Sequence, residues 1–282
     1  MQKKRTWFNR LLLVVCLLVA LLAAGDLAYQ QNWVNFQGTV LRHRQHVAYR
    51  RAQQTTSLSA KKRQQIRQQI MRQTQQDQGL TKQGFVSVPK VGILQPVFND
   101  AYSQKGLAAG ANYANRSEVD PAGKQRPQMG KGNYGLASHN FYDGKTGFSP
   151  LQQNLKDDAP YILKGKHQTN HWLDGQAIYL ANQQGIYVYR ITGQGVVSAT
   201  DIKVLNPTQT AQVTIITCLY PSTQYRIITR GQLQHQYHWQ TAPAKVVGYF
   251  DLTAQKTNAR VNWYNPGTEE GVNGDAGGTK QP

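Results

Sequence analysis

The chain reads Val213-Thr-Ile-Ile-Thr-Cys218-Leu-Tyr-Pro-Ser-Thr-Gln-Tyr-Arg226-Ile-Ile-Thr-Arg230-Gly231 across the stretch that decides its fold. One β-branched run ends at Cys218, seven residues with a proline follow, and a second run begins at Arg226. Such runs predict two strands joined as a hairpin. An antiparallel hairpin would bring Cys218 and Arg226 close together across the strand ends. Arg230 would lie about 13 Å further along the strand, too far to share a site with Cys218.

The middle of the chain shows the same alternation of short runs and breakers. From about Leu80 to Phe250, β-branched and aromatic runs are separated by Gly, Pro, Asn and Asp, which is typical of an all-β barrel or sandwich. This length suffices for one domain with its own core. We therefore expect a mainly β fold with short helices. The expected strands are Phe85–Val88, Val97–Phe98, Tyr134–Ser138, Ala177–Leu180, Ile186–Thr192, Asp201–Leu205, Val213–Cys218 and Arg226–Gly231.

The segment Lys164–Gly175 interrupts this pattern with two histidines, His167 and His171. Histidines four residues apart can share one face of a helix and bind a metal ion. No third ligand follows at a suitable spacing, however, and a zinc site needs at least three protein ligands. We expect a solvated loop here and no metal site.

Positive charge is concentrated before the expected barrel. Residues 1–80 hold 13 of the 32 Lys and Arg residues and two of the 14 Asp and Glu residues. The uncharged run Leu11–Gly25 follows four basic residues, so the positive-inside rule predicts a cytoplasmic N-terminus and a single-pass anchor in the plasma membrane. Cleavage of this run after Ala23-Ala24-Gly25 is the alternative. With a cytoplasmic N-terminus, the rest of the chain would be extracellular.

The chain thus divides into four expected parts. These are an N-terminal signal anchor over residues 1–30, a basic Gln/Arg-rich stalk over 31–80, the barrel over 81–250 and a polar, largely disordered tail over 251–282. The stalk range lacks core-forming residues, and the tail cannot bury enough apolar surface to order itself. The basic charges can attract anionic lipids or wall polymers, or merely keep the stalk solvated. The predicted topology argues against nucleic acid as a partner.

Cys218 has no evident disulfide partner, because the other cysteine, Cys16, lies in the apolar run. Outside the cytoplasm a lone thiol is a liability unless its reactivity is used; the alternative is a small buried apolar residue. A free thiol is mostly protonated at neutral pH and needs a base or a cation nearby. His139 ends an apolar run, where a barrel displays side chains at its rim, although a histidine bonded to nearby backbone is also common. Arg226 has the fixed charge and forked shape that suit an oxyanion.

Several separated motifs, in one order, resemble those of the class A sortases, membrane-anchored cysteine transpeptidases of Gram-positive bacteria. The resemblance covers about Gly84 to Leu233. The motifs are Phe85-Val-Ser-Val-Pro-Lys-Val-Gly, Met129-Gly-Lys-Gly-Asn-Tyr-Gly-Leu-Ala-Ser-His139, Phe148-Ser-Pro-Leu151, Asn206-Pro-Thr208, and Thr214-Ile-Ile-Thr-Cys218 with Arg226 eight positions later.

The resemblance implies an eight-stranded sortase-type β-barrel in which Cys218 attacks the Thr–Gly bond of a Leu-Pro-X-Thr-Gly (LPXTG) sorting signal. The resulting thioacyl-enzyme would be resolved by an amine of lipid II or of the peptidoglycan cross-bridge, which attaches a surface protein to the cell wall. His139 would carry the proton, and Arg226 would hold the substrate or the oxyanion. Positions that line the family's signal-binding groove match Ala137, Pro207, Ile216 and Thr217.

The chain departs from the family pattern at a few positions. Ser138 stands where the family usually has Gly, and Ile215 where it usually has Leu. No cofactor is implied; calcium activates some members, but the sequence offers no acidic cluster that supports it. Asp120-Pro121 is followed by Ala122, so the Asp-Pro-aromatic lid of pilin-polymerising relatives is missing, which favours an anchoring role.

Two other functions stay open at this point. A secreted cysteine endopeptidase would pass the acyl group to water instead of an amine. A non-catalytic wall-binding module would use the basic stalk and leave Cys218 inert.

Overall fold

The computed structural model describes residues 2–30, 47, 56–74, 76–141, 143–155, 157–222 and 224–259. Helix α1 spans Gln2–Gln30. In these ranges no helix combines the length and the apolar character needed to cross a membrane. The signal anchor expected over residues 1–30 is not confirmed.

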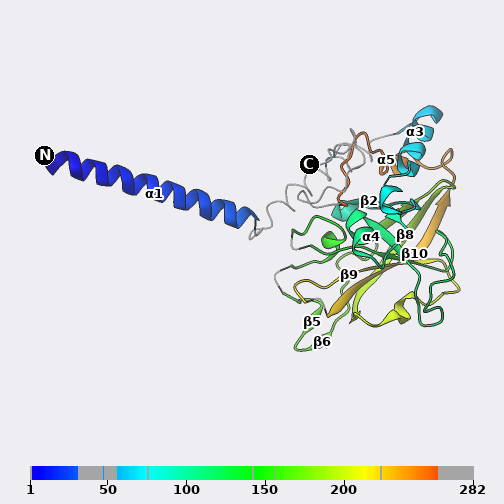
Figure 1. The fold of residues 1–282 in the computed structure, drawn as a ribbon. Coiled ribbons are helices and arrows are strands. Elements are labelled where there is room, and N and C mark those ends of the chain that lie inside the picture. Colours follow the sequence, from blue (N-terminus) through cyan, green and yellow to red (C-terminus); the bar gives the residue numbers. More distant parts are fainter. Residues whose placement is uncertain are drawn as a thin grey trace.

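Eight strands close into a barrel in the order β1-β2-β3-β4-β9-β10-β8-β7, which confirms the expected fold class (Figure 1). Neighbouring strands are antiparallel except for β2–β3 and β4–β9, which are parallel. The barrel strands are β1 (Gly84–Val88), β2 (Ile93–Phe98), β3 (Ala111–Ala114), β4 (Asn133–Ala137), β7 (Ala177–Ala181), β8 (Ile186–Ser198), β9 (Gln212–Cys218) and β10 (Tyr225–Tyr237). A short helical turn, η1 (Gln76–Gln78), precedes β1. Short helices lie in the connections between strands: η2 (Pro89–Val91), α4 (Gln104–Ala109), η3 (Ser149–Leu151) and η4 (Ile202–Leu205).

The barrel core follows from the alternation of side chains along each strand. On β9, Val213 and Ile215 are fully buried in the main apolar cluster, together with Tyr134 and Leu136 of β4. Each such side chain stabilises the fold by about 1.5–3 kcal/mol on burial. Because successive residues point to opposite faces, Cys218 lies on the other face of the sheet.

Several expectations about strands were wrong in detail: β2 begins at Ile93 and not at Val97, and β3 was not expected. The expected strand Asp201–Leu205 is instead the 3-10 helix η4, because the Asp201 carboxylate accepts a hydrogen bond from the Lys203 backbone N–H and caps a helical turn. Strands β8 and β10 are longer than expected and continue to Ser198 and Tyr237. The two strands are hydrogen-bonded to each other along their length, so both continue past glycines and polar residues that interrupt the apolar pattern.

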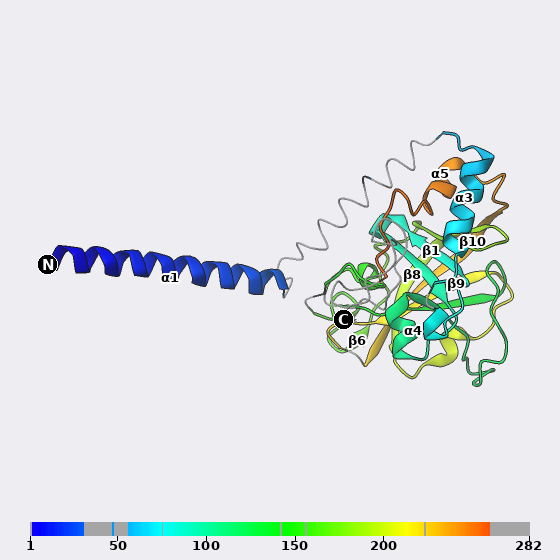
Figure 2. The same ribbon diagram turned by 45° about the horizontal axis from the view of Figure 1, so that its top comes forward.

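Part of the predicted stalk is packed against the barrel. Helix α3 (Ala60–Met71) lies beside α5 (Ala244–Gly248), as Figures 1 and 2 both show. Ile66 and Ile70 of α3 are fully buried, so the expectation of a stalk without core-forming residues was wrong here. Two isoleucines four positions apart give this basic helix an apolar stripe. Residues 31–46, 48–55 and 75 of the predicted stalk lie outside the described ranges.

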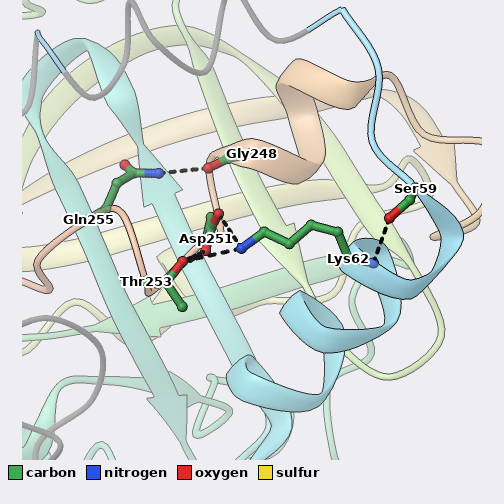
Figure 3. A network of polar contacts seen from close by, with 6 residues as sticks. All are labelled: Ser59, Lys62, Gly248, Asp251, Thr253 and Gln255. Carbon is green, nitrogen blue, oxygen red and sulfur yellow. Dashed lines mark hydrogen bonds and ion pairs between the residues drawn. The ribbon is translucent and has the colours of Figure 1, made fainter.

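The first part of the predicted tail also packs against the domain. We call residues 251–259 the C-terminal strap. Leu252, Asn258 and Ala259 in it are buried, and Asp251 forms an ion pair with Lys62 of α3 at 2.8 Å (Figure 3). The expectation of a largely disordered tail was therefore wrong for this part, and residues 260–282 lie outside the described ranges.

The segment Lys164–Gly175 is only partly a solvated loop. Its first residues form a small hairpin of β5 (Ile162–Leu163) and β6 (Lys166–His167). Its second half is partly packed: Asn170 and Leu173 are buried, and the Trp172 indole N–H donates to Gln194 Oε1 at 2.7 Å. The expectation of solvation was therefore wrong for these three residues, whereas His171, Asp174 and Gly175 are exposed.

Candidate active site

Cys218 and Arg226 lie directly opposite each other in the ladder between β9 and β10. Residues opposed in an antiparallel pair project from the same face with Cβ atoms about 4.5–5.5 Å apart. The pairing that the hairpin predicted is confirmed. Arg230 is paired with Thr214 instead, four positions from Cys218. Both Cys218 and Arg226 are half-buried, and the Arg226 Nη1 donates to the Tyr225 carbonyl at 3.0 Å.

His139 reaches the same end of the sheet from β4. Strand β4 runs parallel to β9, and its last residue, Ala137, is paired with Ile216. Two residues beyond that pair, the segment after β4 reaches His139 and β9 reaches Cys218. His139 therefore leaves β4 at the level where Cys218 leaves β9.

Hydrogen bonds on both sides of His139 fix this arrangement. Before it, the Ser138 carbonyl accepts from the Thr217 hydroxyl at 2.9 Å. After it, Asn140 Nδ2 donates to the Cys218 carbonyl at 2.7 Å. The residues next to His139 are thus bonded to the residues at and before Cys218. The structure brings the three predicted residues to adjoining ends of β4, β9 and β10.

Two amide side chains that the sequence did not single out brace the chain after Cys218. Asn140 Nδ2 also donates to Gln152 Oε1 at 2.6 Å, and that oxygen accepts from the Tyr220 N–H at 2.9 Å. Gln152 Nε2 donates to the Tyr220 carbonyl. Amides in loops carry no periodic signal, and the only clue in the sequence was that Asn140 directly follows His139.

Substituting Asn140 with Ala should loosen the segment that carries Cys218. We expect the free energy of unfolding to fall by about 1–3 kcal/mol, because the Cys218 carbonyl loses its donor, and kcat to fall about tenfold through misplacement of the thiol. Chemical denaturation and steady-state kinetics measure the two effects. Asn154→Ala, which removes a side chain bonded to Asp157 in an exposed turn, is the control. Equal kinetics in both variants would contradict the bracing role.

Burial lowers the pKa of the His139 imidazole below its ordinary value of 6.5. The ring is half-buried and meets the Phe141 ring edge-on, with 5.2 Å between centroids. Desolvation penalises the charged form, so the neutral imidazole predominates at pH 7. A neutral imidazole can accept a proton from a thiol.

The His139 titration provides a direct test of this environment. We expect the imidazole resonance to titrate with a midpoint below 6.5, followed by NMR of histidine-labelled protein and assigned with a His139→Gln variant. Because the folded-state pKa is lowered, the unfolded chain binds the proton first as pH falls. This group's contribution to stability is therefore present above pH 6.5 and is lost as pH falls toward its folded-state pKa. A midpoint above 6.5 would instead indicate an imidazolium beside a thiolate.

The four predicted groove residues do not all share one face. Ala137 and Ile216 are paired, half-buried and on the same face as Cys218. The Thr217 side chain is buried and bonded to the Ser138 carbonyl, so it lies on the opposite face.

Pro207 lies apart from these three residues, in the loop after η4. It is exposed and lines a cavity of about 260 Å³ at the other end of β4. Asn133, which begins β4, also lines this cavity and donates to the Asn206 carbonyl at 3.0 Å. Pro207 therefore lies near the start of β4, whereas Ala137 ends the strand.

The acidic residues near this cavity are engaged by the protein itself. Glu118 forms an ion pair with Lys203 at 3.6 Å. The Asp120 carboxylate accepts from the backbone N–H groups of Gln125 and Lys124, and these bonds lower its pKa. Among the described residues, no group of three or more His, Cys, Asp or Glu side chains could hold a metal ion.

Comparison with known proteins gives one family and a consistent set of relatives. The family described as "Sortase domain" matches residues 86–234. "Sortase A" of Listeria monocytogenes is 29% identical over 152 residues, which cover 54% of this chain and 56% of that protein. "Sortase A" of Streptococcus agalactiae is 26% identical over 181 residues, which cover 62% of each protein. The chain thus spans 56% and 62% of the length of these two relatives, less than two thirds of each.

A solved structure of sortase A from Listeria monocytogenes is similar to this one with a TM-score of 0.46 and 27% sequence identity. The similarity covers 60% of this chain and 97% of that chain.

Proposed function

Because the chain belongs to the sortase family, whose domain spans residues 86–234, we propose that it is a class A cysteine transpeptidase that attaches surface proteins to the cell wall. The observation that carries this proposal is the opposition of Cys218 and Arg226 across β9 and β10, with His139 at the adjoining end of β4. Acyl transfer through a thiol needs a nucleophile, a proton carrier and a donor to the oxyanion. These three residues supply the three roles.

In the first half of the reaction, Cys218 Sγ attacks the carbonyl carbon of Thr in an LPXTG-type sorting signal, and its proton passes to His139. The carbonyl oxygen becomes an oxyanion stabilised by the Arg226 guanidinium. When the C–N bond breaks, the Gly nitrogen takes the proton from His139 and leaves as an amine. The part of the substrate that ends in Thr remains attached to Cys218 as a thioester.

In the second half, an amine of lipid II or of the peptidoglycan cross-bridge attacks the thioester carbon and gives a proton to His139. The C–S bond breaks, the Cys218 sulfur leaves with its electron pair, and His139 returns the proton to it. The partners are then surface proteins with a C-terminal sorting signal. Ala137 and Ile216, on the face of Cys218, are well placed to contact the signal peptide.

We also propose that the protein is a single-pass protein of the plasma membrane, with a cytoplasmic N-terminus and an extracellular barrel. The support is the uncharged run Leu11–Gly25 behind four basic residues. This orientation would place Cys218 where cell-wall precursors are available.

A transfer assay tests the proposed function. The full chain is incubated with a Leu-Pro-X-Thr-Gly peptide, with and without an oligoglycine amine, and products are identified by mass spectrometry. We expect the amine to be joined to the Thr carboxyl group and a thioacyl adduct to be found on Cys218. Cleavage at a rate and with products unaffected by amine would favour the endopeptidase. No cleavage and no adduct with any residue at X would favour the wall-binding module.

A further inference from the structure

Asn258, in the C-terminal strap, bonds to two distant segments of the domain at once. Its backbone N–H donates to the Leu94 carbonyl of β2, and its Oδ1 accepts from the Leu94 N–H, both at 3.0 Å. Its Nδ2 donates to the carbonyls of Lys145 and Gly147, both at 2.9 Å, while its own carbonyl accepts from the Gly147 N–H at 2.8 Å. The residue is 4% exposed. One side chain therefore ties the loop that contains Gly147 to β2.

Gly147 lies directly behind the backbone of His139. The Phe148 N–H donates to the His139 carbonyl at 2.8 Å, and Gly147 forms a bridge with Asn140. A Cβ atom at Gly147 would collide with the His139 carbonyl oxygen, and the residue has a positive φ of 63°. Only glycine meets both demands. The backbone at Gly147 thus sets the position of the backbone at His139.

A second buried amide side chain, that of Gln95, also bonds to Gly147. Gln95 is fully buried and donates to the Gly147 carbonyl at 2.8 Å, and the Ser138 hydroxyl donates to Gln95 Oε1 at 3.3 Å. The Gly147 carbonyl therefore accepts from both Asn258 and Gln95. The network touches the residues on both sides of His139 without involving its ring.

The first residues of the C-terminal strap, Asp251 to Gln255, are bonded to α3 and to α5. Lys62 Nζ contacts Asp251 at 2.8 Å and donates to the Thr253 hydroxyl at 3.2 Å, and Gln255 Nε2 donates to the Gly248 carbonyl at 2.7 Å (Figure 3). The Lys62 contacts are partly exposed, and exposed ion pairs contribute little to stability. The buried bonds of Asn258 are the stronger attachment of the strap.

We propose that Asn258 is a positioning residue, which holds the loop behind His139 in place through Gly147. This inference rests on the proposed function, in which His139 carries the proton between Cys218 and the leaving or attacking amine. Without the Asn258 side chain, the Leu94 N–H loses this acceptor and the carbonyls of Lys145 and Gly147 lose this donor, so the loop is free to shift. His139 then spends less time within reach of Cys218.

The test compares Asn258→Ala with Lys62→Ala and Leu252→Ala in the full chain. Lys62→Ala removes the contacts with Asp251 and Thr253, and Leu252→Ala removes a strap side chain that is buried in the apolar cluster of Ile66 and Ile70. We expect Asn258→Ala to lower kcat about 10- to 100-fold through misplacement of the imidazole. KM should change little, because Ala137 and Ile216 lie on β4 and β9. Both control variants should keep kcat within about twofold, the change expected when no group near the reacting atoms has moved.

Hydrogen–deuterium exchange gives a readout that does not depend on turnover. Asn258→Ala should speed exchange in residues 139–148, whereas Lys62→Ala should not. Unchanged exchange in this loop would overturn the inference, whether or not the wild-type chain transfers a peptide. If the wild-type chain transfers nothing while exchange in the loop responds to Asn258→Ala, the proposed function fails and the loop contact stands.

A second variant, Asn258→Asp, separates positioning from simple stability and replaces Asn258→Ala if that variant does not fold. The carboxylate keeps the acceptor for the Leu94 N–H but has no N–H to give to Lys145 and Gly147. We expect kcat as low as in Asn258→Ala. Full recovery of kcat in Asn258→Asp would show that only the Leu94 contact matters and would overturn the role assigned to Gly147.

Discussion

Cys218→Ala is expected to lose measurable transfer of an LPXTG-type peptide, a fall in kcat of about 10⁴-fold or more. The methyl group that replaces the thiol cannot attack a carbonyl, so no thioacyl-enzyme forms. The fold should persist, because Cys218 is half-buried and lies on the face opposite the core residues Val213 and Ile215. Product formation is measured by chromatography, and the melting temperature is measured in parallel.

Cys16→Ala is the matched control for this variant. Cys16 is exposed in α1, outside the barrel, so its replacement should leave transfer unchanged. Turnover that survives in Cys218→Ala would end the proposal of thiol catalysis. A melting temperature that falls sharply in Cys218→Ala alone would show a structural role for the side chain.

Arg226→Lys should lower kcat/KM by about 10²- to 10³-fold, the loss typical of removing one donor to an oxyanion. Lysine keeps the positive charge but lacks the planar fork that guides two N–H groups toward one oxygen. Arg226 is paired with Cys218, so its side chain leaves the sheet on the same face as the residue that carries the acyl group. Steady-state kinetics with the LPXTG-type peptide measure the effect.

The same strand supplies the matched control, Arg230→Lys. Arg230 lies on the same face of β10 but is paired with Thr214, and it is exposed. Its replacement should change kcat/KM less than about threefold, because lysine keeps the charge and the side chain begins about 13 Å along the strand from Cys218. Similar losses in the two variants would show that the loss in Arg226→Lys does not come from contact with the oxyanion. Unchanged kcat/KM in Arg226→Lys would show that positive charge at this position is sufficient.

The hairpin could be predicted because its information is local. β-Branched runs on both sides of a proline-containing turn indicate two antiparallel strands, and the short connection limits which residues oppose each other. Thus the pairing of Cys218 with Arg226 was predictable, as was the distance of Arg230. The ends of β8 and β10 were not, because pairing between two long strands overrides the glycines in each.

Face assignments were less predictable than strand positions. The resemblance suggested Ile216 and Thr217 together as groove residues, yet neighbours in a strand point to opposite faces. Only Ile216 shares the face of Cys218, while the Thr217 hydroxyl is bonded to the Ser138 carbonyl inside the protein. Motif matching reports positions in the chain and does not report the direction of a side chain.

By itself, the sequence determined the β-barrel class, the strand that ends at the thiol and the arginine opposite to it, because periodic apolar runs and short turns act over a few residues. Only the tertiary structure decided that Ile66 and Ile70 pack on the domain and that Asn258 supports the backbone behind His139. Asn258 and Gly147 are 111 residues apart in the chain. Hydrogen bonds between such distant segments leave no repeating pattern in the sequence. They form only once the barrel has brought the two backbones together.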